Sequence, residues 1–118
     1  MKVAVCGVKS PELLKKIEGH YNVESVGSMS TIYELAKVTY DYDDTKNVVF
    51  NGCVLDCAPN DIHPFDEQIV LCALDNLDAV YVYTKGMTAD EVDNYHQYDE
   101  FYPDRVIDVD NIDTFVIK

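Results

Sequence analysis

The sequence predicts a three-layer α/β protein built on a mainly parallel sheet of five strands. Short apolar runs alternate along the chain with segments whose apolar residues recur at helical spacing. The expected strands are continuously apolar, which is typical of strands buried on both faces of a sheet. Strands that alternate with helices are joined by crossovers, and crossovers make neighbouring strands parallel. At 118 residues the chain has the length of one domain.

The first elements expected are a strand, a turn and a helix at the amino terminus. Residues 2–6 form a buried strand that ends at Gly7. Ser10 and Pro11 begin the helix, because a Ser side chain accepts hydrogen bonds from free helix N–H groups and Pro fits the first turn. A short second strand is expected at residues 21–26.

The middle of the chain is expected to contain a helix, a strand and a second helix. Thr31 and Glu34 have the spacing of a capping box, which begins a helix that ends near Tyr40. Residues 48–50 are the third strand. Asp66 caps the next helix, and apolar residues cover most of the circumference of that helix, so we expect it to pack on the sheet.

The last third of the chain is expected to add two strands and one helix. Residues 79–83 are the fourth strand, and Thr88 and Glu91 form a second capping box that begins a helix. Residues 106–109 are the fifth strand, and residues 114–117 are a candidate for a short sixth strand.

The chain has a net charge of −13, and this charge is unevenly distributed. Residues 1–40 carry five Lys against four Glu, whereas residues 41–118 carry eighteen acids against four bases. Between Thr88 and Asp113, nine acids are opposed only by Arg105. This charge argues against a nucleic-acid or anionic-membrane partner held by electrostatics. The acids form either a solvated surface or a face that docks on a basic partner.

The cysteines and the hydropathy indicate a cytoplasmic protein. We expect Cys6, Cys53, Cys57 and Cys72 to be buried thiols, because a core-rich chain of this size does not need a disulfide framework. The spacing of Cys53 and Cys57 does not match most zinc sites. No apolar run has the length of a membrane span, and nothing resembles a secretory signal.

Several stretches together resemble the P-loop nucleoside and nucleotide kinases, in particular their small phage-type members. The resemblance lies in the first strand with Gly7, Lys9 and Ser10, in residues 48–56, and in residues 78–83 and 102–110. It spans nearly the whole chain. It implies one degenerate kinase-like domain over residues 1–118, with the strand order 2-3-1-4-5.

The catalytic parts of that family are reduced in this chain. The phosphate loop Gly-x-x-x-x-Gly-Lys-Ser/Thr is about four residues short before Lys9. Asn51 and Gly52 stand where the family has Asp-Arg, and only Asp56 remains of that motif. The chain has a single Arg, although loss of one key Arg lowers phosphoryl transfer by roughly 10³–10⁵ in related systems. We therefore predict a non-catalytic member that needs no cofactor.

One candidate ligand site is the turn that contains Gly7, Lys9 and Ser10. A helix N-terminus after a strand is a place where α/β folds bind phosphate. The alternative is a plain helix cap beside a solvated Lys.

A weaker candidate is a metal site at Asp56 and Asp61, close in sequence to His63. Carboxylate oxygens suit Mg²⁺, and these residues follow a strand. The alternative is that the acids form turns in a Pro-rich loop.

A third candidate is a protein-docking face in which aromatic residues interleave with acids. Tyr supplies large contact area, and the acids select a basic partner. The alternative is that the Tyr side chains cover the sheet edge. The same pattern makes a poor nucleic-acid platform, because the acids repel phosphates. The face comprises Asp93, Tyr95, Tyr98, Asp99, Glu100, Tyr102 and Asp104.

These observations predict a binding or regulatory protein, a pseudo-kinase whose acidic face contacts a basic protein. A phage-type inhibitor or regulator of a host or defence factor would fit this description. One alternative is a nucleotide-binding protein, or a weak nucleoside or nucleotide kinase, that uses ATP and Mg²⁺. Another is a subunit of an assembly in which a partner completes the site.

Overall fold

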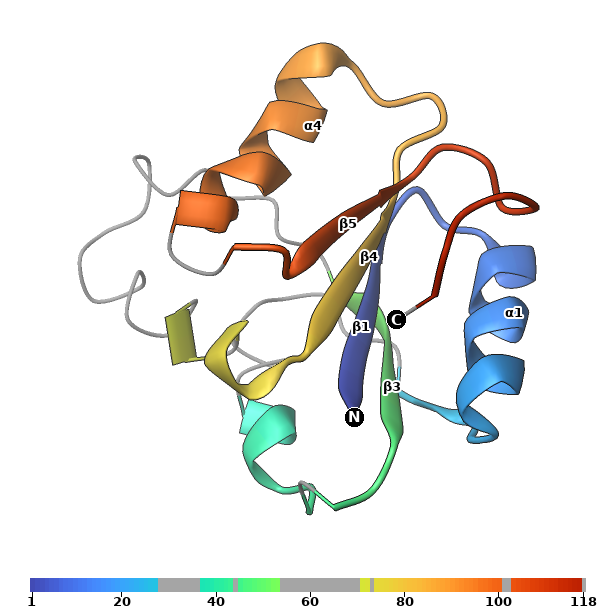
Figure 1. Cartoon of the computed structure of the whole chain (residues 1–118), viewed down its shortest axis with the longest axis vertical. Helices are drawn as coiled ribbons and strands as arrows, with labels where there is room; N and C mark the ends of the chain where they lie inside the picture. The colour runs from blue at the N-terminus through green and yellow to red at the C-terminus, as the bar shows by residue number, and fades with distance from the viewer. Residues whose placement is uncertain (28–36, 44, 54–70, 73, 101–102, 118) are drawn as a thin grey trace.

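The computed structural model describes residues 1–27, 37–43, 45–53, 71–72, 74–100 and 103–117. Its centre is a five-stranded, all-parallel sheet with the order β2-β3-β1-β4-β5. The strand order predicted from the sequence is thereby confirmed. Figure 1 shows the sheet between α1 on one side and α4 on the other.

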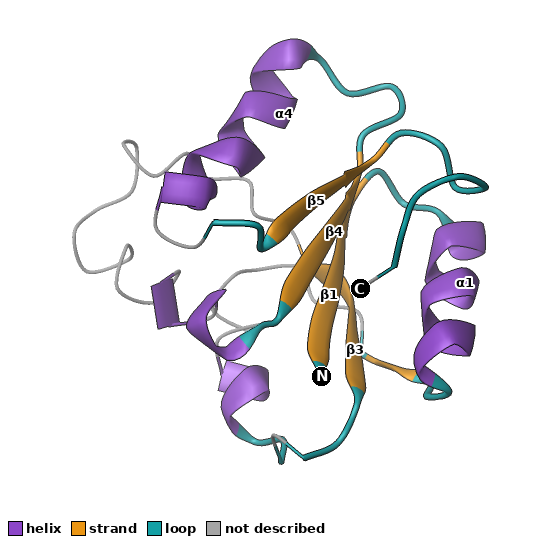
Figure 2. Ribbon diagram, in the orientation of Figure 1, coloured by secondary structure: helices purple, strands orange, loops and turns teal. Residues whose placement is uncertain are grey.

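The secondary structure follows the predicted alternation of strands and helices (Figure 2). The elements are β1 (Lys2–Gly7), α1 (Pro11–Tyr21), β2 (Ser25–Val26), β3 (Val48–Cys53), β4 (Ala79–Tyr83), α4 (Ala89–His96), the 3₁₀ helix η2 (Gln97–Glu100) and β5 (Val106–Val109). Residues 37–40, 71–72 and 74–76 are also helical. They belong to the two helices expected to begin at Thr31 and near Asp66, and both of these residues lie outside the described part of the chain.

β1 is the central strand, and all of its neighbours are parallel to it. It pairs with β3 from Lys2 opposite Val48, and with β4 from Val3 opposite Ala79. Val3 and Ala4 are fully buried. A parallel strand covered on both faces must be apolar throughout, which explains why this segment has no polar alternation.

Each face of the sheet has its own apolar core. Alternate residues of β1 divide between the two cores, with Val3 and Val5 facing α1, and Ala4 and Cys6 facing the opposite side. Leu13, Ile17 and Tyr21 bury one face of α1 on the sheet. Leu74, Leu77 and Tyr95 belong to the core on the other face. This arrangement has the three layers expected from the sequence.

The segment after β5 completes the layer that contains α1. Ile112, Phe115 and Ile117 pack against the core on this face, and the Phe115 ring meets the Tyr81 ring edge-on at 6.0 Å. Lys16 of α1 donates to the Ile112 carbonyl, and its Nζ lies 4.8 Å from the centre of the Phe115 ring. No strand is present at residues 114–117, so the expectation of a sixth strand is wrong.

Capping residues position both long helices as predicted. The Ser10 hydroxyl accepts from the Leu13 N–H, and Pro11 occupies the first turn of α1. The Thr88 hydroxyl accepts from the Glu91 N–H, and the Glu91 carboxylate accepts from the Thr88 N–H, which completes the capping box of α4.

The expected second strand is shorter than predicted. Residues 21–26 were expected to be a strand, but α1 continues to Tyr21 and ends at Asn22, whose φ of 57° lets its N–H bond to the Glu18 carbonyl. Only Ser25 and Val26 are extended in β2. A left-handed residue at this position ends a helix through a local hydrogen bond, and Asn is one of the residues that tolerate it.

The expectation of buried thiols is wrong for Cys6 and Cys72. Cys6 is buried and disulfide-bonded, and the residue bonded to it lies outside the described side chains. Cys72 is free but exposed. Disulfides persist mainly in oxidising compartments, so the cytoplasmic location stays a prediction.

Gly7 provides a test of the junction between β1 and β4. Its φ is +87°, and a Cβ at this position would lie 2.6 Å from the Tyr83 carbonyl oxygen. We expect Gly7→Ala to lower the free energy of unfolding by about 2–5 kcal/mol, because both backbone strain and overpacking oppose the new methyl group. Urea denaturation followed by circular dichroism measures the loss.

Gly19 supplies the matched control, since it lies in α1 and a Cβ there would meet no atom within 4 Å. Gly19→Ala should raise the free energy of unfolding by about 0.5–1 kcal/mol. Equal effects of the two substitutions would contradict the described geometry of the turn.

Candidate functional site

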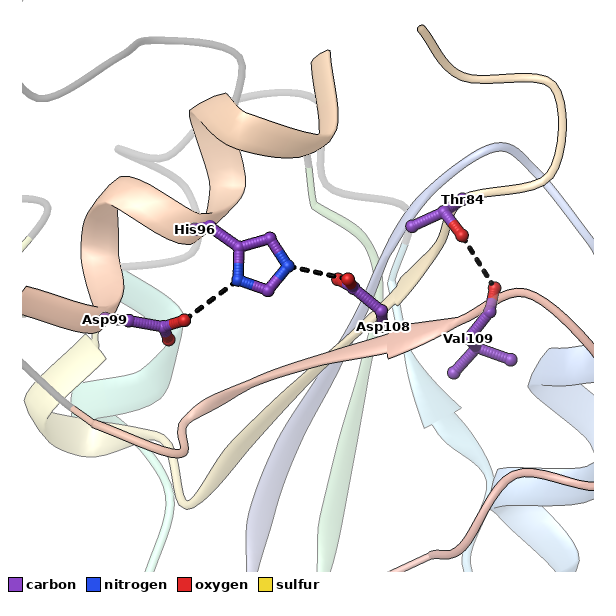
Figure 3. Close-up of polar contacts among 5 residues, drawn as sticks. All are labelled: Thr84, His96, Asp99, Asp108 and Val109. Atoms are coloured by element: carbon purple, nitrogen blue, oxygen red, sulfur yellow. Dashed lines mark hydrogen bonds and ion pairs between the residues drawn. The ribbon is translucent and has the colours of Figure 1, made fainter. Parts of the chain in front are cut away.

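A connected cluster of polar side chains lies between α4 and β5 (Figure 3). His96, the last residue of α4, is 2.9 Å from Asp99 through its Nδ1 and 2.6 Å from Asp108 through its Nε2. The three side chains are each 35–40% exposed. The imidazole therefore connects α4 both to η2 and to the edge strand β5.

Local structure explains how these groups meet. Tyr95 is 6% exposed and packs in the core between α4 and the sheet, which places the next residue at the helix boundary. Val106 faces the same core, so Asp108, two residues later on β5, points to the same side. His96 and Asp99 are three residues apart, a spacing at which side chains on helical turns contact each other.

The two carboxylates stabilise the protonated form of the ring. Hydrogen bonds to Asp108 and then to Asp99 raise the pKa of His96 above its ordinary value, and partial burial lowers the pKa by less. Imidazolium has two N–H donors, so one ring donates to both carboxylates only when it is protonated.

This geometry does not favour catalysis or metal binding at His96. Both ring nitrogens have carboxylate partners, so neither is available as a base for a substrate or as a metal ligand. The two Asp side chains lie on different nitrogens of the ring and do not converge on one point (Figure 3). No group of three or more metal-ligating side chains is found among the described residues.

An acidic surface surrounds this cluster. We call it the α4–β5 acidic face and define it by its exposed carboxylates. These are Asp90, Glu91, Asp93, Glu100, Asp104, Asp108, Asp110 and Asp113. Arg105 does not neutralise this surface with its Nη1, which donates to the carbonyl oxygens of Leu74, at 3.0 Å, and Leu77.

Lys2, like Arg105, donates to a backbone carbonyl inside the protein. Lys2 is 4% exposed, and its Nζ donates to the Thr39 carbonyl at 2.9 Å. Thr39 lies in helical residues 37–40, and Leu74 lies in helical residues 74–76. Lys and Arg at helix C-termini satisfy free carbonyls and interact favourably with the helix dipole. These bonds of Lys2 and Arg105 therefore stabilise the fold.

The turn after β1 has the position of a phosphate site but few free donors. The Val8 N–H donates to the Tyr83 carbonyl at 3.0 Å, and the Leu13 N–H donates to the Ser10 hydroxyl. Pro11 has no N–H. Lys9 is exposed, and Gly7 is held against β4. The candidate site at Gly7, Lys9 and Ser10 is thus a capped helix start, and its binding of phosphate stays a prediction.

The structure divides the predicted docking residues into three groups. Asp93, Glu100 and Asp104 are exposed, and Asp99 is half-buried against His96. Tyr95 is in the core, so the expectation that it contacts a partner is corrected: its ring packs under α4.

The remaining predicted site residues cannot be placed. Tyr102, Asp56, Asp61 and His63 lie outside the described residues, as does the side chain of Tyr98.

Sequence reasoning found no partner for His96. The Asp99 contact has a visible signal, the His-x-x-Asp spacing at the end of a helix. The Asp108 contact has none, because it depends on how α4 lies across β5.

No protein-family model, curated protein or solved structure matches this chain. The relationship to P-loop kinases therefore stays a prediction. The described helices are all too short or too polar to cross a lipid bilayer.

The cluster predicts an unusual titration for His96. We expect the imidazole NMR signals of His96 to titrate with a midpoint above 6.5, because two carboxylates favour the imidazolium. Asp108→Asn should lower this midpoint, since the largest cause of the raised pKa is removed. A midpoint at or below 6.5, or one unchanged by Asp108→Asn, would contradict the contact.

Proposed function

We propose that this chain is a non-catalytic acidic protein that acts by binding a protein with a basic surface. A phage-type inhibitor or regulator of a host or defence factor is the kind of protein that this activity suits. The proposal rests on the α4–β5 acidic face and, for the absence of catalysis, on the incomplete phosphate loop.

The observation that supports the proposal is the exposed state of the acids. Carboxylates on α4, on β5 and in the adjoining turns reach solvent, while the Nη1 of Arg105, the single guanidinium in the sequence, donates to backbone carbonyls. Complementary potentials accelerate association and discriminate against wrong partners. Such a face suits a basic protein and repels phosphates and anionic lipids.

Reversal of two charges tests whether this face binds. We expect the Asp93→Lys and Glu100→Lys double variant to weaken the complex at least tenfold, about 1.4 kcal/mol, because two attractive charges become repulsive. A partner captured from the cells that encode the chain would be purified, and its affinity measured by biolayer interferometry at two salt concentrations. Binding should weaken at high salt, where exposed charges are screened.

Asp41→Lys with Glu24→Lys is the matched control. Both residues are exposed, and the residue types and the net charge change are the same. Glu24 precedes β2 and Asp41 follows helical residues 37–40, so neither belongs to the α4–β5 acidic face. The control should keep the affinity within about threefold, since only general charge changes. Equal losses in both variants would show that no particular face is used, and a salt-independent complex would contradict an electrostatic contact.

A second candidate function is nucleotide binding. Its support is the position of Lys9 and Ser10, which follow the central strand of a parallel sheet and precede α1. Ligands of open α/β sheets bind at the carboxyl ends of the strands, at the point where the strand order reverses. ATP and Mg²⁺ would be the ligands in this case.

Calorimetric titration with ATP and dATP, with and without Mg²⁺, separates the two functions. Under the preferred proposal, we expect no heat and no thermal stabilisation up to millimolar nucleotide, because the phosphate loop is short. Micromolar binding that is abolished by Lys9→Ala would support the second function. Lys15→Ala on the exposed side of α1 is the matched control and should leave any binding unchanged.

A further inference from the structure

We propose that His96 is a pH-sensitive latch that holds α4 against the sheet. In its protonated form the ring ties the end of α4 to Asp108 of β5 and to Asp99 of η2. Loss of the proton releases one of these contacts and loosens α4. The device is independent of the proposed binding function.

Few of the described side chains of α4 are buried. Among its described side chains, Tyr95 is buried, Val92 and His96 are half-buried, and the others are exposed. Tyr95 supplies an apolar contact with the core, and His96 supplies a polar contact with β5. An element held by so few buried groups opens at a lower free energy than the core strands do. A change at His96 therefore acts on one of the contacts that hold α4 to the sheet.

Protonation decides how many hydrogen bonds the cluster makes. Imidazolium donates from Nε2 to Asp108 and from Nδ1 to Asp99. The neutral ring has one N–H, so one of the two carboxylates then faces a ring nitrogen lone pair. Asp99 is already poorly satisfied, because within the described part of the chain its Oδ1 is buried without a hydrogen-bond partner. The neutral state is thus disfavoured on both geometric and electrostatic grounds.

The Coulombic contributions to the raised pKa of His96 come from Asp108 and Asp99, its two contacts. Three more carboxylates are close to the cluster in sequence: Asp93 one turn earlier on α4, Glu100 on η2, and Asp110 two residues beyond Asp108. β4 carries no carboxylate and no cationic side chain. The nearest cation in sequence, Arg105, directs its Nη1 to the Leu74 and Leu77 carbonyls. Nearby acids favour the charged imidazolium.

The sign of the pH dependence follows from the raised pKa of His96. The latch contributes fully below about pH 6.5, the ordinary value for His, and is lost as the pH rises through the folded value. Alkaline conditions therefore loosen α4, and acidic conditions hold it. Since α4 carries part of the α4–β5 acidic face, the orientation of that face becomes pH-dependent.

Hydrogen exchange of the whole chain tests the latch. Protection factors of α4 amides, corrected for the intrinsic exchange rate at each pH, would be measured from pH 5.5 to 9, with α1 as internal reference. We expect the ratio of α4 to α1 protection to fall across the His96 midpoint, by about tenfold for each unit by which the folded pKa exceeds 6.5. A ratio that stays constant across this midpoint would overturn the proposal.

Variants distinguish the latch from general alkaline loosening. His96→Gln should give low α4 protection that no longer depends on pH, and Asp108→Asn should move the fall to lower pH. His20→Gln is the matched control: His20 is exposed on α1, beside the Tyr21 ring, and should leave the wild-type fall intact. The same pH-dependent fall in His96→Gln would assign it to another group. If His96→Gln does not fold, the shift in Asp108→Asn decides.

Discussion

Burial of β1 on both faces and along both edges is the constraint on which the rest of the structure depends. Its backbone pairs with β3 and β4, and its side chains supply both cores. The chain can leave this strand only through a tight turn, in which Gly7 lies against the Tyr83 carbonyl and the Val8 N–H bonds to it. That requirement joins the turn to β4 and occupies a donor that a phosphate loop would need.

Several cationic side chains bind backbone carbonyls of the protein. Lys2, Lys16 and Arg105, three of the nine bases, donate to backbone carbonyls within the protein. Buried carbonyls that lack partners destabilise a fold, so these bonds are structural. Some acids also make internal bonds: Asp78 accepts from the Lys2 N–H, and Glu18 accepts from the Ser25 N–H. Many others are exposed, including those of the α4–β5 acidic face. These carbonyl bonds tie three of the cationic side chains to the backbone of the fold.

His96 lies at the boundary between the buried side of α4, where Tyr95 packs in the core, and the α4–β5 acidic face. Its two carboxylate partners would repel each other without the imidazolium between them, so the ring compensates locally for an excess of acids. Under the proposed latch, the acidic face gains its sensitivity to pH at His96, which lies between two carboxylates.

The sequence by itself determined the fold class, the order of the strands through the resemblance, and the helix starts at Ser10 and Thr88. These features depend on local patterns: apolar runs, capping spacings and the alternation of elements. Tertiary structure alone decided that Tyr95 is buried, that Arg105 turns inward and that Asp108 meets His96. Each of these depends on which distant segments lie side by side, and no spacing along the chain encodes the angle at which a helix crosses a strand.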